Sequence, residues 1–382
     1  MYNIHNHYFN IYDFLKSIIA CPKLIYLHPF GSSGIENIET FDVLNSNDTD
    51  PVFLCYDQEP LIQGYNDKLF QYIRYENFKR PLILLNTELD SEPKEYFLNK
   101  FRMIDSYAFF HIFAAHDWYR GYRYSLAIKP VAERKVNKAY IAFNRLTGSA
   151  RIYRSMLVAE LAKKDLLKHG HVSYSHICPD HGHYRDNLPE ATSRYGVSPE
   201  YVQSTVNILD TLDHPLRIDH VDKDAIPNHS MVLSAVPECM ESLVYVVTET
   251  CFWEKKKHLT EKIFKPIILR MPFILVGCAN NLEYLKSYGF KTFDRWFDES
   301  YDSIEDPIER IQAVTKVLED LSRKSNDELT SMLREMQEVL DYNYNLFNSQ
   351  EFLDKAWEEL TTNLRNAIKS VPNVSYSTGA RE

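Results

Sequence analysis

Polar side chains that could bind a phosphorylated ligand follow an apolar stretch in the second half of the chain. Residues 243–247 form a short, mostly β-branched run, which is typical of a strand buried on both faces. Glu249 follows this run, and after a charged loop come Thr260, Glu261 and Lys262. Thr260 is a suitable N-cap, so a helix is expected to begin there. Because ligands bind beyond the carboxyl ends of strands in open α/β sheets, these side chains are expected at a binding edge.

A second group of candidate ligand-binding residues lies upstream and is basic. Residues 138–145 predict a strand, and residues 150–167 carry apolar side chains close to helical spacing. Arg145, Arg151 and Arg154 cluster where this strand ends and the helix starts. A helix N-terminus favours anions, and arginine adds paired donors that suit a diphosphate. We therefore expect a phosphate-binding role here, with Arg151 as the first candidate.

The stretch 241–277 resembles the donor-binding half of α1,3-fucosyltransferases and related GT-B glycosyltransferases. In that family a glutamate closes a strand and a Thr-Glu-Lys triplet opens the next helix, and Glu249 and residues 260–262 match these features. The resemblance implies that Lys262 meets the nucleotide diphosphate and that a glutamate meets the ribose. Residues 166–175 are similar to the family's next strand, which would place His176 in the nucleotide pocket. The loop is slightly longer than in the family, and Pro266 lies inside the helix.

The composition indicates a globular protein of two domains. The chain has 382 residues, of which 45% are hydrophobic and 25% charged. Six scattered cysteines, no signal peptide and no apolar run of membrane-spanning length predict a cytoplasmic protein without a membrane span. A net charge of −10 argues against a wholly electrostatic nucleic-acid binder, although a local basic groove could still exist. No GxGxxG or Walker loop is present, so dinucleotide enzymes and P-loop NTPases lack their fingerprint.

The order of predicted elements favours two α/β domains of the Rossmann-like kind, and the resemblance implies the GT-B arrangement with a helical C-terminal segment. Strands are predicted at 24–27, 52–56, 82–85 and 107–112, with helices at 65–78 and 94–102. Residues 180–197 are predicted to be rich in loop, and helices are predicted at 199–212, 307–321, 327–342 and 351–368. The expected limits are an acceptor-side domain at 1–135, a nucleotide-sugar-binding domain at 136–348, a helix at 349–370 that crosses back to the first domain, and a flexible tail at 371–382.

Carboxylates that could act as a general base follow the strands predicted in the first domain. Transfer to a hydroxyl needs such a base and also stabilisation of the departing diphosphate. Asp57 and Glu59 come directly after the strand 52–56 and are the first candidates, followed by Asp117 and Glu88. Each of them is also a common type of turn or capping residue.

The sequence favours a reaction without a metal ion. It has no DxD triplet of the kind that metal-dependent glycosyltransferases use. His171, His176, Cys178, Asp180, His181 and His183 lie close together in the chain, but their spacing fits no paired zinc pattern.

Together these features predict a glycosyltransferase that moves a sugar from a nucleotide diphosphate sugar, GDP- or UDP-linked, to the hydroxyl of a glycan or other small acceptor. No tightly bound cofactor is expected, and inversion at the anomeric carbon is implied by the resemblance. The stretch 289–302 also resembles glycosyltransferase-like proteins of tailed phages. Two alternatives stay open: a DNA-base glycosyltransferase acting on hydroxymethylated pyrimidines, and a nucleotide- or glycan-binding protein without turnover.

Overall fold

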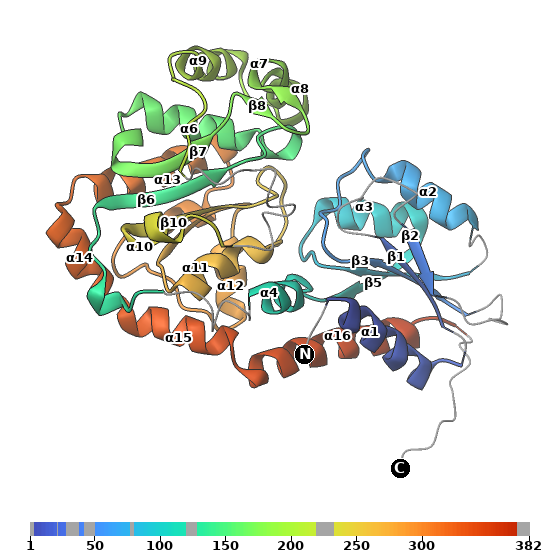
Figure 1. The fold of residues 1–382 in the computed structure, drawn as a ribbon. Helices are drawn as coiled ribbons and strands as arrows, with labels where there is room; N and C mark the ends of the chain where they lie inside the picture. The colour runs from blue at the N-terminus through green and yellow to red at the C-terminus, as the bar shows by residue number, and fades with distance from the viewer. Residues whose placement is uncertain are drawn as a thin grey trace. The chain divides into compact units, whose positions relative to one another are not determined.

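The computed structural model describes residues 4–20, 22–27, 38–41, 50–76, 80–119, 128–218 and 233–372. The chain forms two compact units, one made of Met1–Asp117 with Ser349–Glu382 and the other of Trp118–Asn348. Each unit is built around its own, mainly parallel sheet (Figure 1). The α/β class that the sequence predicts is therefore confirmed.

The first unit contains a five-stranded sheet in the order β2-β1-β3-β4-β5. Only β2 runs antiparallel to its neighbour, and the other four strands are parallel. The strands are β1 (Lys23–Leu27), β2 (Ile38–Phe41), β3 (Val52–Tyr56), β4 (Leu82–Asn86) and β5 (Met103–Tyr107). β3 and β4 are buried at every position, as expected for central strands covered on both faces.

Helices cover both faces of this first sheet. The helices of the unit are α1 (Ile4–Ile18), α2 (Asp67–Glu76), α3 (Glu92–Phe101), α4 (His111–Tyr119) and α16 (Gln350–Lys369). Alternate strand residues such as Phe53 and Ile83 pack with α1 and α16, whereas Leu54 and Leu84 pack with α2 and α3. The helix that ends the described chain thus completes the core of the unit in which the chain begins.

The prediction of a strand at 107–112 is wrong. The last strand, β5, ends at Tyr107, and His111 begins the helix α4. The chain turns at Arg102, which has a left-handed backbone with φ of 51°, so the strand starts directly at Met103. Phe109, Ile112 and Phe113 then have the spacing of one helical face, and all are buried.

The second unit contains a four-stranded, fully parallel sheet in the order β11-β10-β6-β7. Its strands are β6 (Lys138–Asn144), β7 (Gly170–Tyr174), β10 (Ser242–Thr248) and β11 (Phe273–Val276). A short antiparallel hairpin of β8 (Ile177–Cys178) and β9 (Gly182–His183) follows β7. Because β6 and β10 are neighbours at the centre of the sheet, the loops after them meet at one edge.

Several of the second unit's helices match the sequence prediction, and others differ from it. The α-helices are α6 (Tyr153–Lys163), α7 (Tyr184–Asn187), α8 (Pro189–Tyr195), α9 (Pro199–Leu209), α10 (Val236–Met240), α11 (Phe264–Leu269), α12 (Asn281–Ser287), α13 (Pro307–Ser322), α14 (Asn326–Glu335) and α15 (Gln337–Phe347). The stretch 180–197, predicted as rich in loop, includes the short helices α7 and α8. The helix predicted at 327–342 is two helices, because α14 ends at the buried Met336 and α15 starts after it.

Single-turn helices complete the description. They include η2 (Val131–Glu133), η3 (Ser149–Arg151), η4 (Leu167–His169), η7 (Glu261–Ile263) and η8 (Ser300–Ser303). The predicted tail lies outside the described residues from 373 onward. Within the described ranges, no helix is both long enough and apolar enough to cross a membrane.

Candidate functional site

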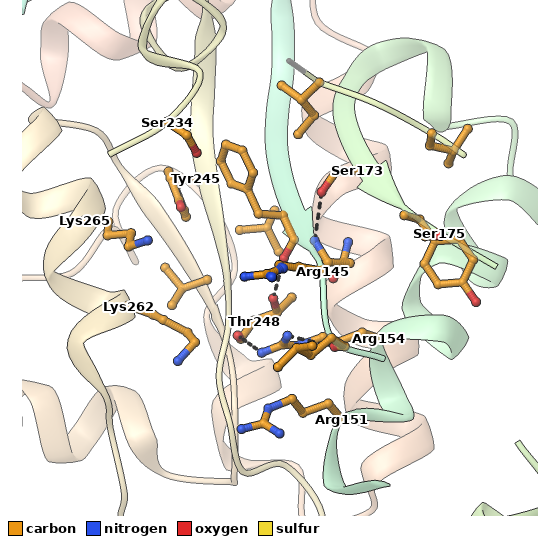
Figure 2. A pocket seen from close by; sticks show the side chains of 18 of the residues that line it. Arg145, Arg151, Arg154, Ser173, Ser175, Ser234, Tyr245, Thr248, Lys262 and Lys265 are labelled. Carbon is orange, nitrogen blue, oxygen red and sulfur yellow. Dashed lines mark hydrogen bonds between the residues drawn. The ribbon is translucent and has the colours of Figure 1, made fainter. Parts of the chain in front are cut away.

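A cavity of about 490 Å³ lies in the second unit, where the strands β6, β7 and β10 end. Its size is ordinary for a small-molecule site. Its walls come from the ends of these strands, the end of η3, η7 with α11, the β8–β9 hairpin, and the segments around Leu216 and Ser234 (Figure 2). The cavity therefore occupies the position at which parallel α/β sheets bind ligands.

The charge of the cavity wall is strongly positive, in contrast to the whole chain. Five cationic side chains line it, and Glu261 is the one carboxylate among the described lining residues. The cations are Arg145, Arg151, Arg154, Lys262 and Lys265. The chain carries a net charge of −10, so this concentration of positive charge is local and suits an anionic ligand.

Arg145 and Arg151 reach the cavity from the loop that follows β6. Arg145 comes directly after the last residue of the strand, and Arg151 ends the single turn η3. Figure 2 shows Arg151 extended towards the side of the cavity from which Lys262 approaches. An anion between these side chains would meet planar guanidinium donors on one side and an ammonium on the other.

Arg154 lies in the same wall but is already engaged. It is 4% exposed, and its guanidinium donates to the carbonyl oxygens of Leu146 at 2.9 Å, Thr248 at 2.7 Å and Glu249 at 3.0 Å. These bonds join the loop after β6 to the end of β10. Arg154 thus fixes the shape of the cavity edge and adds its charge, while its Nε has no hydrogen-bond partner among the described residues.

Lys262 is held in place by a network that starts at a buried carboxylate. Glu249 is 0% exposed and accepts the Thr260 hydroxyl at 2.6 Å and the Thr260 N–H at 3.2 Å. Lys262 Nζ in turn donates to the hydroxyls of Thr260 at 3.2 Å and Thr250 at 3.3 Å, and to Glu261 Oε1 at 3.1 Å. Burial raises the pKa of Glu249, although the nearby Lys262 ammonium and the Thr260 hydrogen bonds act to lower it.

The sequence-predicted residues of this edge therefore fall into two groups. Glu261 and Lys262 line the cavity, whereas Glu249 and Thr260 lie behind it and orient Lys262. Thr260 also caps η7, since its side chain accepts the Lys262 N–H. The local structure around the Thr-Glu-Lys triplet thus brings a positioned ammonium to the end of β10.

His176 is close to the cavity but is not among the residues that line it. Its ring centroid lies 5.2 Å from that of His214 and 5.6 Å from that of His183. This ring cluster supports the wall beside it, where Tyr174 and Leu216 exchange two backbone hydrogen bonds of 2.9 and 3.0 Å. His176 is accordingly placed as a support of the wall around Leu216.

The β8–β9 hairpin packs against the loop that carries Arg145 and Arg151. The Thr147 N–H points to Cys178 Sγ at 3.4 Å. A Cβ on Gly148 would lie only 2.4 Å from the Cβ of His181, so the absence of a side chain permits this approach. The hairpin contributes Ile177 to the cavity wall, and Ile177 is 52% exposed.

Side chains of the histidine-rich stretch have other neighbours in the structure. His171 bonds to Glu241 Oε1 at 2.8 Å, Cys178 faces Thr147, and His181 packs on Gly148. Over the described ranges, no group of three or more His, Cys, Asp or Glu side chains is arranged to hold a metal ion.

The candidate general bases lie in the first unit, in different environments. Asp57 follows β3, is 1% exposed, and accepts a hydrogen bond from Cys55, whose thiol pKa is raised by burial and by this carboxylate. Glu59 is half-buried in the same turn. Glu88 is fully buried and accepts the Leu61 N–H at 2.8 Å and the Ser91 hydroxyl at 2.5 Å.

These contacts separate the four carboxylates. Glu88 ties the turn after β3 to the turn after β4, which is a structural role. Asp117 lies in the last turns of α4 and not at the end of a strand, because the strand predicted before it is a helix. Asp57 and Glu59 keep the position at a strand's carboxyl end that motivated their choice.

Several cavity residues were missed by the sequence analysis. They include Lys265, Tyr245, Ser173, Ser175, Ser234 and Leu269. For Lys265 a signal existed, since it follows Glu261 by four residues and Lys262 by three, and these are the spacings of one helical face. The contribution of the loop segments could not be found from spacing, because it depends on how they fold over the sheet.

Comparison with known proteins adds no further constraint, since the chain matches no protein-family model, no curated protein and no solved structure.

Proposed function

We propose that this protein is a glycosyltransferase whose second unit binds a nucleotide diphosphate sugar in the cavity beyond β6, β7 and β10. In this proposal the two α/β units are the two Rossmann-like domains of a GT-B enzyme. The acceptor is a glycan or another small hydroxyl compound.

The observation that carries the proposal is the convergence of Arg145, Arg151 and Lys262 on one cavity at the carboxyl ends of neighbouring parallel strands. A diphosphate bears charges that such fixed donors hold well, and charge on the departing diphosphate grows in the transition state. Lys262 is preorganised by Thr250 and Thr260, so little reorganisation is needed when charge develops.

The apolar part of the cavity supports a ligand that is more than a phosphate. Phe143 and Tyr245 lie with their ring centroids 5.5 Å apart, and Leu216 and Leu269 also line the wall. A nucleoside offers the matching flat, weakly polar surface, whereas inorganic phosphate alone would leave this wall unused.

Two measurements test the proposal. Calorimetry with GDP, UDP, ADP, CDP and pyrophosphate should detect binding of at least one nucleoside diphosphate, with pyrophosphate weaker. Incubation with the corresponding nucleotide sugars should release nucleoside diphosphate, and EDTA should leave this release largely intact because basic side chains serve the leaving group. No binding of any diphosphate would overturn the donor-site assignment. Binding without turnover on a broad acceptor panel would instead favour a nucleotide-binding protein.

A further inference from the structure

The cavity is elongated along the central strand of the second sheet. Residues 245–248 of β10 all line it, which corresponds to a length of about 10 Å at the rise of a strand. Glu261, Lys265 and Leu269 also line it at a spacing of four residues, which is one face of η7 and α11. This helix face therefore lines the cavity together with β10 and the ends of β6 and β7.

The two ends of this elongated cavity differ in chemistry. The arginines and Lys262 gather where the strands end, while Tyr245 lies three residues before the end of β10. Figure 2 shows Lys265, Tyr245 and Ser234 together on one side and Arg151 and Arg154 at the other end. A phosphate held at the strand ends thus leaves room for a ribose before the aromatic end is reached.

Apart from the Glu261 carboxylate, which pairs with Lys262 at 3.1 Å, the polar groups near the aromatic end are mainly hydrogen-bond donors. The Lys265 ammonium carries three donors and no acceptor. Burial raises the pKa of Tyr245 well above its usual value, so its phenol stays protonated and can donate. Ser234 adds a hydroxyl that can donate or accept a hydrogen bond. A ligand group that lies here is best matched when it presents acceptors.

Nucleobases differ in this respect. Guanine and uracil carry exocyclic carbonyl oxygens, which accept hydrogen bonds, and lysine pairing with guanine O6 and N7 is a common specific contact. At the ring position of guanine O6 and uracil O4, adenine and cytosine carry an amino group, which would place a donor against the Lys265 ammonium. A site that hydrogen-bonds one group of its ligand discriminates strongly against an analogue that lacks this group.

We propose that Lys265 selects the base of the nucleotide, with its ammonium donating to a carbonyl oxygen of guanine or uracil that lies against Phe143 and Tyr245. This inference rests on the proposed function, since it assigns the base-binding half of the same cavity. The aromatic rings and Leu269 favour a flat base here over a second free anion.

The test compares Lys265→Met, Lys265→Arg and the unchanged protein by calorimetry with GDP, UDP, ADP, CDP and pyrophosphate. Methionine keeps the length of the side chain and removes its charge, and arginine keeps the charge. We expect the unchanged protein to bind GDP or UDP about ten- to a hundredfold more tightly than ADP and CDP. Lys265→Met should remove most of this preference and leave pyrophosphate affinity unchanged. Lys265→Arg should restore part of it.

Two outcomes would overturn the inference and leave the proposed function intact. One is equal affinity of the unchanged protein for all four nucleoside diphosphates. The other is an equal loss of pyrophosphate and nucleotide affinity in Lys265→Met, which would make Lys265 another phosphate ligand. Failure of the proposed function is distinguishable, because the unchanged protein would then bind neither pyrophosphate nor any nucleotide. Thermal melting of each variant verifies that it is folded.

Discussion

The Thr260 hydroxyl donates a 2.6 Å hydrogen bond to the buried carboxylate of Glu249, and the same hydroxyl accepts from Lys262 Nζ at 3.2 Å. The oxygen of Thr260 thus links a carboxylate at the end of β10 to the ammonium that lines the cavity. Glu249 positions Lys262 through Thr260 and is not itself among the residues that line the cavity. Lys262, which lines the cavity, is thus distinct from Glu249 and Thr260, which orient it.

The first prediction concerns Glu249→Gln. The amide has one accepting oxygen where the carboxylate has two, so at least one donor of Thr260 or Thr250 loses its buried partner. Leaving a buried donor unpaired costs about 1–3 kcal/mol, so chemical denaturation should show a loss of that order. Nucleoside diphosphate affinity should fall less than in Lys262→Met. The exposed Glu283→Gln on α12 is the matched control, and a Glu249→Gln variant as stable as this control would contradict the anchoring role.

The second prediction is a double-mutant cycle between Arg151 and Lys262. Each charged hydrogen bond to phosphate contributes roughly 1.5–3 kcal/mol, so Lys262→Met and Arg151→Ala should each weaken pyrophosphate binding about ten- to a hundredfold. Because both would meet one diphosphate, the double variant should lose less than the product of the two single losses. Lys316→Met, on the surface of α13, serves as the control for charge alone. Strictly multiplicative small losses would argue against a shared ligand.

Local patterns predicted much of the fold because the decisive interactions are local. The β-branched run of β10 and the cap at Thr260 depend on neighbours in sequence, and both are present in the structure. The strand predicted at 107–112 failed because an apolar run fits a buried strand or a buried helix equally well. The turn at Arg102 decided between them, and arginine gives no sequence signal for a left-handed backbone.

The arrangement of side chains in the candidate site was harder to predict from the sequence than the fold. Spacing suggests that Glu249 and Arg154 lie at strand and helix ends, but not which way their side chains turn. Glu249 is buried behind the cavity by its pairing with Thr260, 11 residues away, and Arg154 is fixed in the cavity wall by its bond to the carbonyl oxygen of Thr248, 94 residues away. The aromatic end around Tyr245 needs β10 and α11 to be brought face to face.

The third prediction concerns Gly148→Ala. The added Cβ would lie 2.4 Å from the His181 Cβ, so the β8–β9 hairpin has to move away from the loop that carries Arg145 and Arg151. We expect a lower melting temperature and weaker nucleoside diphosphate binding. His181→Gly removes the opposing atom, so the double variant Gly148→Ala/His181→Gly should recover most of the affinity relative to His181→Gly alone. A Gly148→Ala variant with unchanged nucleotide binding would show that the packing of the hairpin against this loop does not affect the cavity.

The fourth prediction concerns the base for the acceptor hydroxyl. If Asp57 or Glu59 takes this proton, Asp57→Asn or Glu59→Gln should lower turnover by about 10²–10⁴-fold, the usual contribution of general-base catalysis. Donor binding should be unchanged, since neither residue belongs to the cavity in the second unit. Steady-state kinetics and calorimetry on the same preparations separate the two effects. Near-normal turnover in both variants would place the base elsewhere, with Asp117 as the next candidate.

The fifth prediction uses the titration of Lys265. Burial and the neighbouring Lys262 ammonium lower its pKa to about 8, although Glu261 acts to raise it. Below that pH the ammonium can donate to a base, and above it the donor charge is lost. The affinity for GDP or UDP should therefore fall as the pH rises through about 8. Lys265→Met, titrated with the same nucleotide, should lack this component, which removes the contribution of the base's own ionisation. If nucleotide affinity changed with pH in the same way in both proteins, a contact between Lys265 and the base would be contradicted.

The same pKa has a consequence for stability that does not depend on any ligand. In the unfolded chain a lysine keeps its proton up to about pH 10.4. Between about pH 8 and that value the unfolded chain binds more protons than the folded one at Lys265, so the stability associated with this residue rises with pH there. Below about pH 8 Lys265 is charged in both states, so the whole destabilising contribution of its half-buried ammonium is present. Lys265→Met should thus melt at a higher temperature than the unchanged protein at pH 7, and the difference should shrink towards pH 10. A difference that stays constant from pH 7 to 10 would mean that Lys265 titrates like an ordinary surface lysine.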